Sequence, residues 1–229
     1  MSSSLKQRTI YGLFWSFTGN FANQGVTFVV GIILARLLTA KEYGLIGMTT
    51  VFIVISQTII DSGFTQALIR KNNCTVEDYS TVFFFNLVIG ILFYLILFVT
   101  AGFISSFFNE PELLKIIRII SINIIINSLA IVQATILTKQ LNFKLLTKIS
   151  FFSALFSGTL GIILAYKGFG VWSLVWRTIS GSVLTLIFLW TFSDWRPKTV
   201  FSKKSFKDLF GFGSKLLASN LIDQIYWNI

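Results

Sequence analysis

Long apolar stretches alternate with short polar loops along this sequence, and each stretch is about as long as a bilayer is thick. A spanning helix needs about 20 apolar residues, so the pattern predicts an all-α integral membrane protein. A seventh helix is predicted to start near Phe206, where mixed apolar and basic residues suit a helix lying along the membrane surface. The six predicted spans cover residues 10–34, 43–60, 81–103, 114–137, 149–166 and 171–190.

Composition agrees with a membrane environment. Hydrophobic residues make up 54% of the chain, charged residues only 12%, and 25 residues are Phe, which exceeds what the core of a water-soluble protein of this length needs. The net charge of +10 comes from basic residues in short loops, and these do not form a nucleic-acid groove or motif. An anionic lipid surface is therefore the expected partner, and nucleic acid is not.

Catalysis, metal binding and cofactor binding are not expected. The chain has a single cysteine, Cys74, and no histidine, so it offers neither an internal disulfide nor the ligand clusters of zinc or iron sites. A membrane-embedded glycosyltransferase or polymerase would need carboxylates on a sizeable loop. The sequence contains no Asp-x-Asp pair and no loop long enough to fold as a domain.

The distribution of Lys and Arg predicts the orientation. Cytoplasmic loops of membrane proteins carry an excess of these residues. One set of alternate loops contains twelve of them: Lys6, Arg8, Arg70, Lys71, Lys139, Lys144, Lys148, Arg196, Lys198, Lys203, Lys204 and Lys207. The opposite set contains five: Arg36, Lys41, Lys115, Arg118 and Lys167. The amino terminus is therefore predicted to be cytoplasmic.

Polar residues inside the spans are the candidates for function, because lipid cannot satisfy their hydrogen bonds. In the first span they fall within about 60 degrees of one helix face at 100 degrees per residue. This stripe either makes hydrogen bonds to neighbouring helices or forms one wall of a substrate path. Its members are Ser16, Asn20, Asn23, Gln24 and Thr27.

Two further spans repeat this pattern. The second carries Thr50, Gln57 and Asp61 on one face. Asp61 precedes Ser-Gly, so it could equally end the helix at the membrane interface and pair with Arg70. The fourth predicted span carries two asparagines one turn apart, with Arg118 on roughly the opposite face. These asparagines are Asn123 and Asn127.

Arg177 is the one cation placed clearly inside a predicted span, with Ser173, Ser180 and Gly181 on its face. It lies about 9 Å along the helix from Val171 at 1.5 Å per residue. Its side chain could therefore reach the headgroups. The small, polar face around it favours the wall of a cavity.

Four motifs between the predicted helices resemble the polysaccharide flippases, the O-antigen and oligosaccharide exporters of the multidrug, oligosaccharidyl-lipid and polysaccharide superfamily. They follow the family's order over nearly the whole chain. They are Ala35-Arg36-Leu37-Leu38 with Tyr43-Gly44, Asp61-Ser62-Gly63-Phe64 with Ala67-Leu68-Ile69-Arg70, Gly168-Phe169-Gly170-Val171-Trp172-Ser173-Leu174-Val175, and Phe210-Gly211-Phe212-Gly213-Ser214.

The resemblance implies two six-helix lobes around a central cavity that opens alternately to either side of the membrane. Residues 1–195 would form the first lobe, and residues 196–229 a cytoplasmic linker and the start of a second lobe. The second lobe would be missing from this chain. The protein would lie in the bacterial cytoplasmic membrane.

The cargo implied by the resemblance is an undecaprenyl-diphosphate-linked oligosaccharide. Arg177 is the expected diphosphate contact, since an unpaired diphosphate is too costly to bury. Neutral amides suit sugar hydroxyls. The expected sugar contacts are Asn20, Asn23, Gln24, Gln57, Asn123 and Asn127, and the interface or gating candidates are Asp61, Arg70 and Arg36.

Two alternatives remain open. A multidrug and toxin extrusion antiporter has a similar architecture, but it needs an intramembrane carboxylate for its cation, and the first span contains no acid. The second alternative is a truncated membrane fragment that does not transport. It is suggested by the final helix, which stops at Ile229 without a capping residue.

Overall fold

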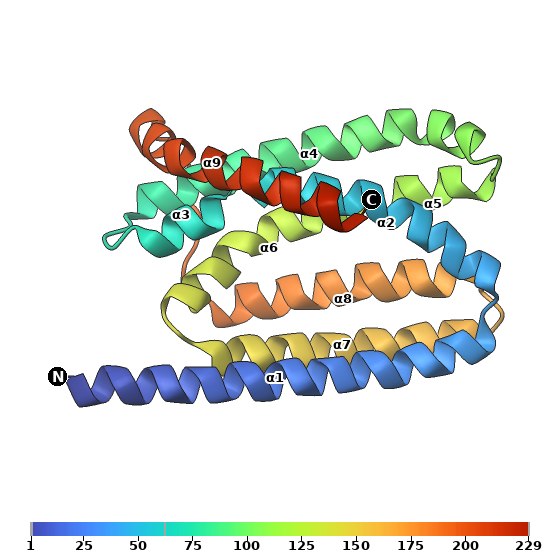
Figure 1. Ribbon diagram of the computed structural model, residues 1–229, viewed down its shortest axis with the longest axis horizontal. Helices are drawn as coiled ribbons and strands as arrows, with labels where there is room; N and C mark the ends of the chain where they lie inside the picture. Colours follow the sequence, from blue (N-terminus) through green and yellow to red (C-terminus); the bar gives the residue numbers. More distant parts are fainter. Residues whose placement is uncertain (1, 62, 229) are drawn as a thin grey trace. The chain divides into compact units, whose positions relative to one another are not determined.

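The computed structural model describes residues 2–61 and 63–228, with the side chains of residues 2–14, 16, 217–218 and 220–228 excepted (Figure 1). This part of the chain is helical and contains no strand. Its helices are α1 (Ser2–Leu37), α2 (Ala40–Asp61), α3 (Phe64–Arg70), α4 (Val76–Phe107), α5 (Glu112–Ile120), α6 (Ile122–Lys139), α7 (Phe143–Tyr166), α8 (Val171–Phe192) and α9 (Lys203–Asn228).

The expectation of an all-α membrane protein with six spans is confirmed. Six helical segments of the described chain are long and apolar enough to cross a bilayer. Each contains or largely overlaps one predicted span, and most continue beyond it, because helices continue into the polar headgroup layer where charged residues are stable. The segments are Phe17–Leu37, Ala40–Arg70, Val76–Phe107, Glu112–Lys139, Phe143–Tyr166 and Val171–Phe192.

The fourth span differs from the single helix that the pattern predicts. It is interrupted at Ser121, which separates α5 from α6. The Ser121 hydroxyl donates to the carbonyl of Arg118 at 3.3 Å. A serine that bonds back to the preceding turn competes with the helical ladder and bends the helix. The apolar pattern of the sequence does not predict this bend.

Helix α3 is also absent from the sequence prediction. Gly63 adopts φ of +70°, which ends α2 and redirects the chain. The Asp61 carboxylate then accepts hydrogen bonds from the Thr65 hydroxyl at 2.5 Å and from the Thr65 N–H at 3.4 Å. Phe64, Ala67 and Leu68 follow at helical spacing and are buried. This short helix therefore forms through local capping and burial of one face.

The described chain divides into two compact units. Unit 1 comprises Met1–Ile46 and Ile136–Ser193, and unit 2 comprises Gly47–Thr135 and Asp194–Ile229. Helices α2 and α6 each contribute to both units. The boundary between a first lobe and a linker near residue 195 stays a prediction, and residues 194–229 belong with unit 2.

In unit 1, α7 packs against both α1 and α8 (Figure 1). Small residues allow this close approach: a Cβ on Gly158 of α7 would lie 2.6 Å from Val30 of α1, and one on Gly181 of α8 would lie 3.1 Å from Ser157 of α7. Lipid is as apolar as leucine, so membrane helices associate mainly through such close packing. A cluster of Val30, Leu34, Leu38, Ala165 and Leu174 forms the apolar core of this unit.

In unit 2, α4 packs against α5, and α9 contacts α3 and α4. The start of α4 carries a capping box in which the Thr75 hydroxyl accepts from the Asp78 N–H and the Asp78 carboxylate accepts from the Thr75 N–H. Farther along α4, a Cβ on Gly90 would lie 2.9 Å from the Ser128 hydroxyl of α6. The helices of this unit therefore also meet at small residues.

The packing at Gly158 yields a first prediction. Gly158→Val places two methyl groups against Val30 and should lower the unfolding free energy by about 1–3 kcal/mol, the usual cost of overpacking. The midpoint of thermal unfolding in detergent measures the effect. Gly31→Val is the matched control, because a Cβ at Gly31 on α1 meets open space. Equal midpoints for the two variants would contradict the close α1–α7 contact.

Candidate functional site

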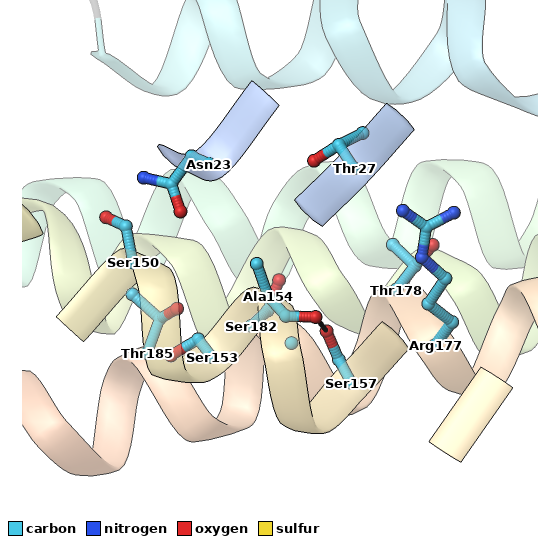
Figure 2. Close-up of a pocket in the computed structure, with 11 residues that line it drawn as sticks. Asn23, Thr27, Ser150, Ser153, Ala154, Ser157, Arg177, Thr178, Ser182 and Thr185 are labelled. Atoms are coloured by element: carbon cyan, nitrogen blue, oxygen red, sulfur yellow. Dashed lines mark hydrogen bonds between the residues drawn. The ribbon is translucent and has the colours of Figure 1, made fainter. Parts of the chain in front are cut away.

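Unit 1 contains a polar pocket formed by α1, α7 and α8. Its volume is about 510 Å³. Figure 2 shows its side chains in a row, with Arg177 at one end and Asn23 and Ser150 at the other. The lining residues are Asn23 and Thr27 from α1, Ser150, Ser153, Ala154 and Ser157 from α7, and Arg177, Thr178, Gly181, Ser182 and Thr185 from α8.

Arg177 is held in place by a close helix contact. A Cβ on Gly161 of α7 would lie 3.0 Å from Arg177 Cβ and 3.3 Å from its Cγ and Cδ. The aliphatic part of the arginine therefore lies directly over the Gly161 backbone, and its guanidinium reaches the pocket. A larger residue at position 161 would push this side chain away.

Arg177 is half-buried and, in the part of the chain that the structure describes, no carboxylate forms an ion pair with its guanidinium. The nearest acid in unit 1, Glu42, instead accepts bonds from the N–H and hydroxyl of Thr39 at 2.6 and 2.9 Å, in a cap of α2. A cation inside a membrane span is costly unless it meets an anion or a polar cavity. Arg177 is therefore the group of this pocket best suited to an anion.

Two other pocket atoms are buried and make no hydrogen bond to a described residue: Asn23 Oδ1 and Ser153 Oγ. Buried polar atoms in proteins are almost always paired, so these two are unusual among the polar groups of the pocket residues. Hydroxyls and one amide surround a single cation, and the lining contains no acid. The pocket can therefore bind an anionic group together with polyhydroxyl groups.

A smaller hollow of about 170 Å³ adjoins this pocket and shares Asn23 and Ser150 with it. Asn20 and Thr147 also line it. The Thr147 hydroxyl donates to the Trp15 carbonyl at 3.0 Å, which ties α7 to α1 at this level. The two hollows extend the polar surface along α1.

The first-span stripe is only partly reproduced in the pocket. Asn20, Asn23 and Thr27 line the two hollows, whereas Gln24 is exposed and lines neither. The side chain of Ser16 lies outside the described residues. Beside Arg177, only Gly181 of the three expected neighbours lines the pocket. Ser173 and Ser180 instead donate to the carbonyls of Gly170 and Arg177.

The remaining candidates lie elsewhere. Gln57, Asn123 and Asn127 belong to unit 2 and are not part of the unit 1 pocket. Gln57 Nε2 and Asn123 Oδ1 are buried and bond to no described residue, and Asn127 is half-buried. Their contribution to a substrate path stays a prediction.

The structure does not show the expected pairing among the interface or gating candidates, Asp61, Arg70 and Arg36. In the described residues no ion pair joins Asp61 to Arg70, because Asp61 caps α3 through Thr65. The Arg70 guanidinium lies over the Phe212 ring, 4.3 Å from its centre, where a cation and an aromatic face attract each other. Arg36 is exposed in the last turn of α1.

Sequence reasoning placed Arg177 and Gly181 on one face of α8, but it missed the other α8 residues of the pocket and the whole α7 wall. Ser150, Ser153 and Ser157 recur at spacings of three and four, and so do Thr178, Ser182 and Thr185. This spacing marks one helix face. Serine and threonine are common in membrane helices as packing residues, so the pattern becomes informative only when the two faces are seen to meet.

Comparison with known proteins shows what the chain is similar to. The family model described as polysaccharide biosynthesis protein matches residues 33–229. The chain is 29% identical over 234 residues to the teichuronic acid biosynthesis protein TuaB of Bacillus subtilis, covering 99% of the chain and 47% of TuaB. It is 28% identical over 211 residues to the succinoglycan biosynthesis transport protein ExoT of Rhizobium meliloti, covering 92% of the chain and 43% of ExoT.

A third relative is the lipopolysaccharide biosynthesis protein WzxC of Escherichia coli, 25% identical over 232 residues, with 99% of the chain and 46% of WzxC covered. The chain thus spans about half the length of these curated relatives. No solved structure matches the chain.

The pocket predicts water access to one face of α8. In a Cys74→Ser background, Thr178→Cys should react with a charged, water-soluble maleimide, because a thiolate forms only where water reaches it. Trp176→Cys, two residues away on an exposed face outside the pocket, should react at least about tenfold more slowly, since hydrocarbon suppresses thiol ionisation. Labelling rates in membrane vesicles, followed by mass spectrometry, test this. Equal rates would mean that the Thr178 face is not a wet pocket.

Proposed function

Since the chain belongs to the polysaccharide biosynthesis family of flippases, we propose that it forms the first lobe of a transporter for lipid-linked oligosaccharides. The cargo is a sugar chain on a polyprenyl diphosphate carrier, moved across the cytoplasmic membrane of a bacterium for cell-surface polysaccharide synthesis. The protein acts as a transporter and not as an enzyme. The observation that carries this proposal is the polar, acid-free pocket around Arg177.

Arg177 supplies the charge that a diphosphate needs. Moving an unpaired anion into a low-dielectric region is prohibitive, and a guanidinium binds phosphate oxygens through two parallel hydrogen bonds. Among the residues that line the pocket, Arg177 is the single charged one. We therefore assign the diphosphate to the Arg177 end of the pocket.

The opposite end of the pocket suits the sugars. Asn23, Ser150 and Ser153 offer amide and hydroxyl groups there (Figure 2), and such groups exchange hydrogen bonds with sugar hydroxyls without the desolvation cost of a charge. Asn20 continues this surface in the adjoining hollow. Gln57, Asn123 and Asn127 of unit 2 are further candidates, whose side chains would form hydrogen bonds with the sugars at other points of the path.

Alternating access requires a second lobe that closes the open side of the pocket. A polar pocket facing lipid would be unstable, so we propose that a second six-helix lobe covers it and that the two lobes open in turn to either side. The relatives, about twice as long as the chain, have the length for such a lobe. An acid-free pocket does not favour the alternative of an organic-cation antiporter.

The proposed orientation has its own test. With the amino terminus cytoplasmic, Asn109→Cys between α4 and α5 should react with an impermeant maleimide in intact cells, and Asn73→Cys between α3 and α4 should react only after the cells are opened. Both residues are exposed, and Cys74 is replaced by Ser in both variants. The reverse labelling pattern would invert the assignment made from the Lys and Arg distribution.

Replacement of Arg177 tests the proposed function. Arg177→Ala should reduce surface polysaccharide by more than about tenfold, because removing one partner of a buried charged contact costs well over one factor of ten. The assay is complementation of a flippase-deficient strain, first with the chain alone and with a version extended by a second lobe, and then with variants of whichever version restores export.

Arg118→Ala is the matched control for this experiment. Arg118 lies over the Phe98 ring, 4.4 Å from its centre, and outside the pocket. Arg177→Lys, which keeps the charge but loses the bidentate geometry, should retain part of the export. Normal export by Arg177→Ala, at normal protein level in the membrane, would refute the diphosphate assignment.

A further inference from the structure

The segment between α8 and α9 is bound to the second turn of α4. The Lys198 N–H donates to the Ser80 hydroxyl at 3.0 Å, and the Ser202 N–H donates to the Thr81 hydroxyl at 3.0 Å. Both hydroxyl residues are fully buried. The segment is not helical at these positions, so α4 supplies hydrogen-bond acceptors that the segment lacks within itself.

One carboxylate lies beside these bonds, where α3, α4 and α9 meet. Asp78, only 1% exposed, accepts from the Lys71 ammonium at 2.8 Å and from the Thr75 N–H at 2.9 Å. The Ser205 side chain in the first turn of α9 lies beside the same carboxylate. Asp78 therefore ties the end of α3 to the start of α4 at the place where α9 begins.

Aromatic rings extend the contact along α9. The Phe64 ring of α3 is fully buried, and its centre lies 5.9 Å from that of Phe206 and 6.1 Å from that of Phe210. The Phe85 ring of α4 lies 5.0 Å from Phe64 and 5.1 Å from Phe206. Rings at these separations attract each other beyond their burial.

The backbones of α9 and the α2–α3 turn touch at two glycines. A Cβ on Gly63 would lie 2.5 Å from the carbonyl oxygen of Gly213, so no larger residue fits at position 63. These residues belong to two motifs that are far apart in the sequence, Asp61-Ser62-Gly63-Phe64 and Phe210-Gly211-Phe212-Gly213-Ser214. Figure 1 shows α9 running beside α3 and α4, as the contacts require.

We infer that α3 and the start of α4 form a seat that holds residues 194–213 as a fixed part of unit 2. The seat consists of Gly63, Phe64, Asp78, Ser80, Thr81 and Phe85. In the proposed transporter this segment leads toward the second lobe, so the seat makes α3 and α4 move with the connection between the lobes. That consequence rests on the proposed function, whereas the seat itself does not.

Proteolysis of the purified chain in detergent tests the seat without any transport assay. Trypsin cleaves after lysine, and Lys198, Lys203 and Lys204 lie in the seated segment. Ser80→Ala with Thr81→Val removes both acceptors and should speed cleavage after these lysines by about tenfold, since two hydrogen bonds are lost. Mass spectrometry gives the rate at each site.

The control variant combines Thr100→Val and Ser106→Ala. These α4 hydroxyls donate only to carbonyls of their own helix, Ile96 and Gly102, so cleavage of the segment should keep its original rate. Cleavage after Lys115 in α5 reports general unfolding and should not change in either variant. Equal rates of cleavage in the unmodified chain and in the Ser80→Ala, Thr81→Val variant would overturn the inference.

A disulfide tests whether the seat stays closed during transport. In a Cys74→Ser background, Thr81→Cys with Ser202→Cys should cross-link on oxidation, and export by a version that complements should continue. Thr100→Cys with Ser202→Cys is the control, because position 100 lies about 28 Å farther along α4. Failure to cross-link would contradict binding of the segment to the seat. Cross-linking that blocks export until a reductant is added would contradict the claim that the segment stays bound during transport.

Discussion

Hydrocarbon offers no hydrogen-bond partner, and this constraint decides where polar side chains of the chain lie. Exposed hydroxyls of the spans satisfy it within their own helices: Thr100, Thr159 and Thr191 donate to the carbonyl four residues earlier. Asn23 Oδ1 and Ser153 Oγ bond to no described residue, although both are buried. The pocket of unit 1 therefore contains polar groups that the fold itself does not use.

Close helix packing creates this pocket and positions its cation. The α1–α7 contact depends on Gly158 of α7. The aliphatic part of the Arg177 side chain, from α8, lies across Gly161, which is also on α7. The small residues of α7 thus serve two purposes. They bring the helices together, and they leave room for one long side chain whose charge reaches a cavity lined by hydroxyls.

The two compact units carry different tasks in our proposal. Unit 1 presents the polar pocket, and unit 2 contains the seat for residues 194–213. Helices α2 and α6 belong to both units, and α6 is separated from α5 by the bend at Ser121. These two helices and the junction between Ser193 and Asp194, which follows α8 directly, are the covalent links between the two units.

The sequence by itself determined the fold class and the number of spans, and it singled out Asn20, Asn23 and Arg177 as candidates, because apolar length and a polar residue inside it are local properties. It did not reveal the bend at Ser121, which depends on one side-chain hydrogen bond, or helix α3, which depends on the bonds between Asp61 and Thr65 and on burial of one face. The serines of α7 and the seat of α9 were also invisible to it. Only the tertiary structure decided these, because a common residue such as serine or glycine becomes a wall or a contact through the helix that lies opposite it.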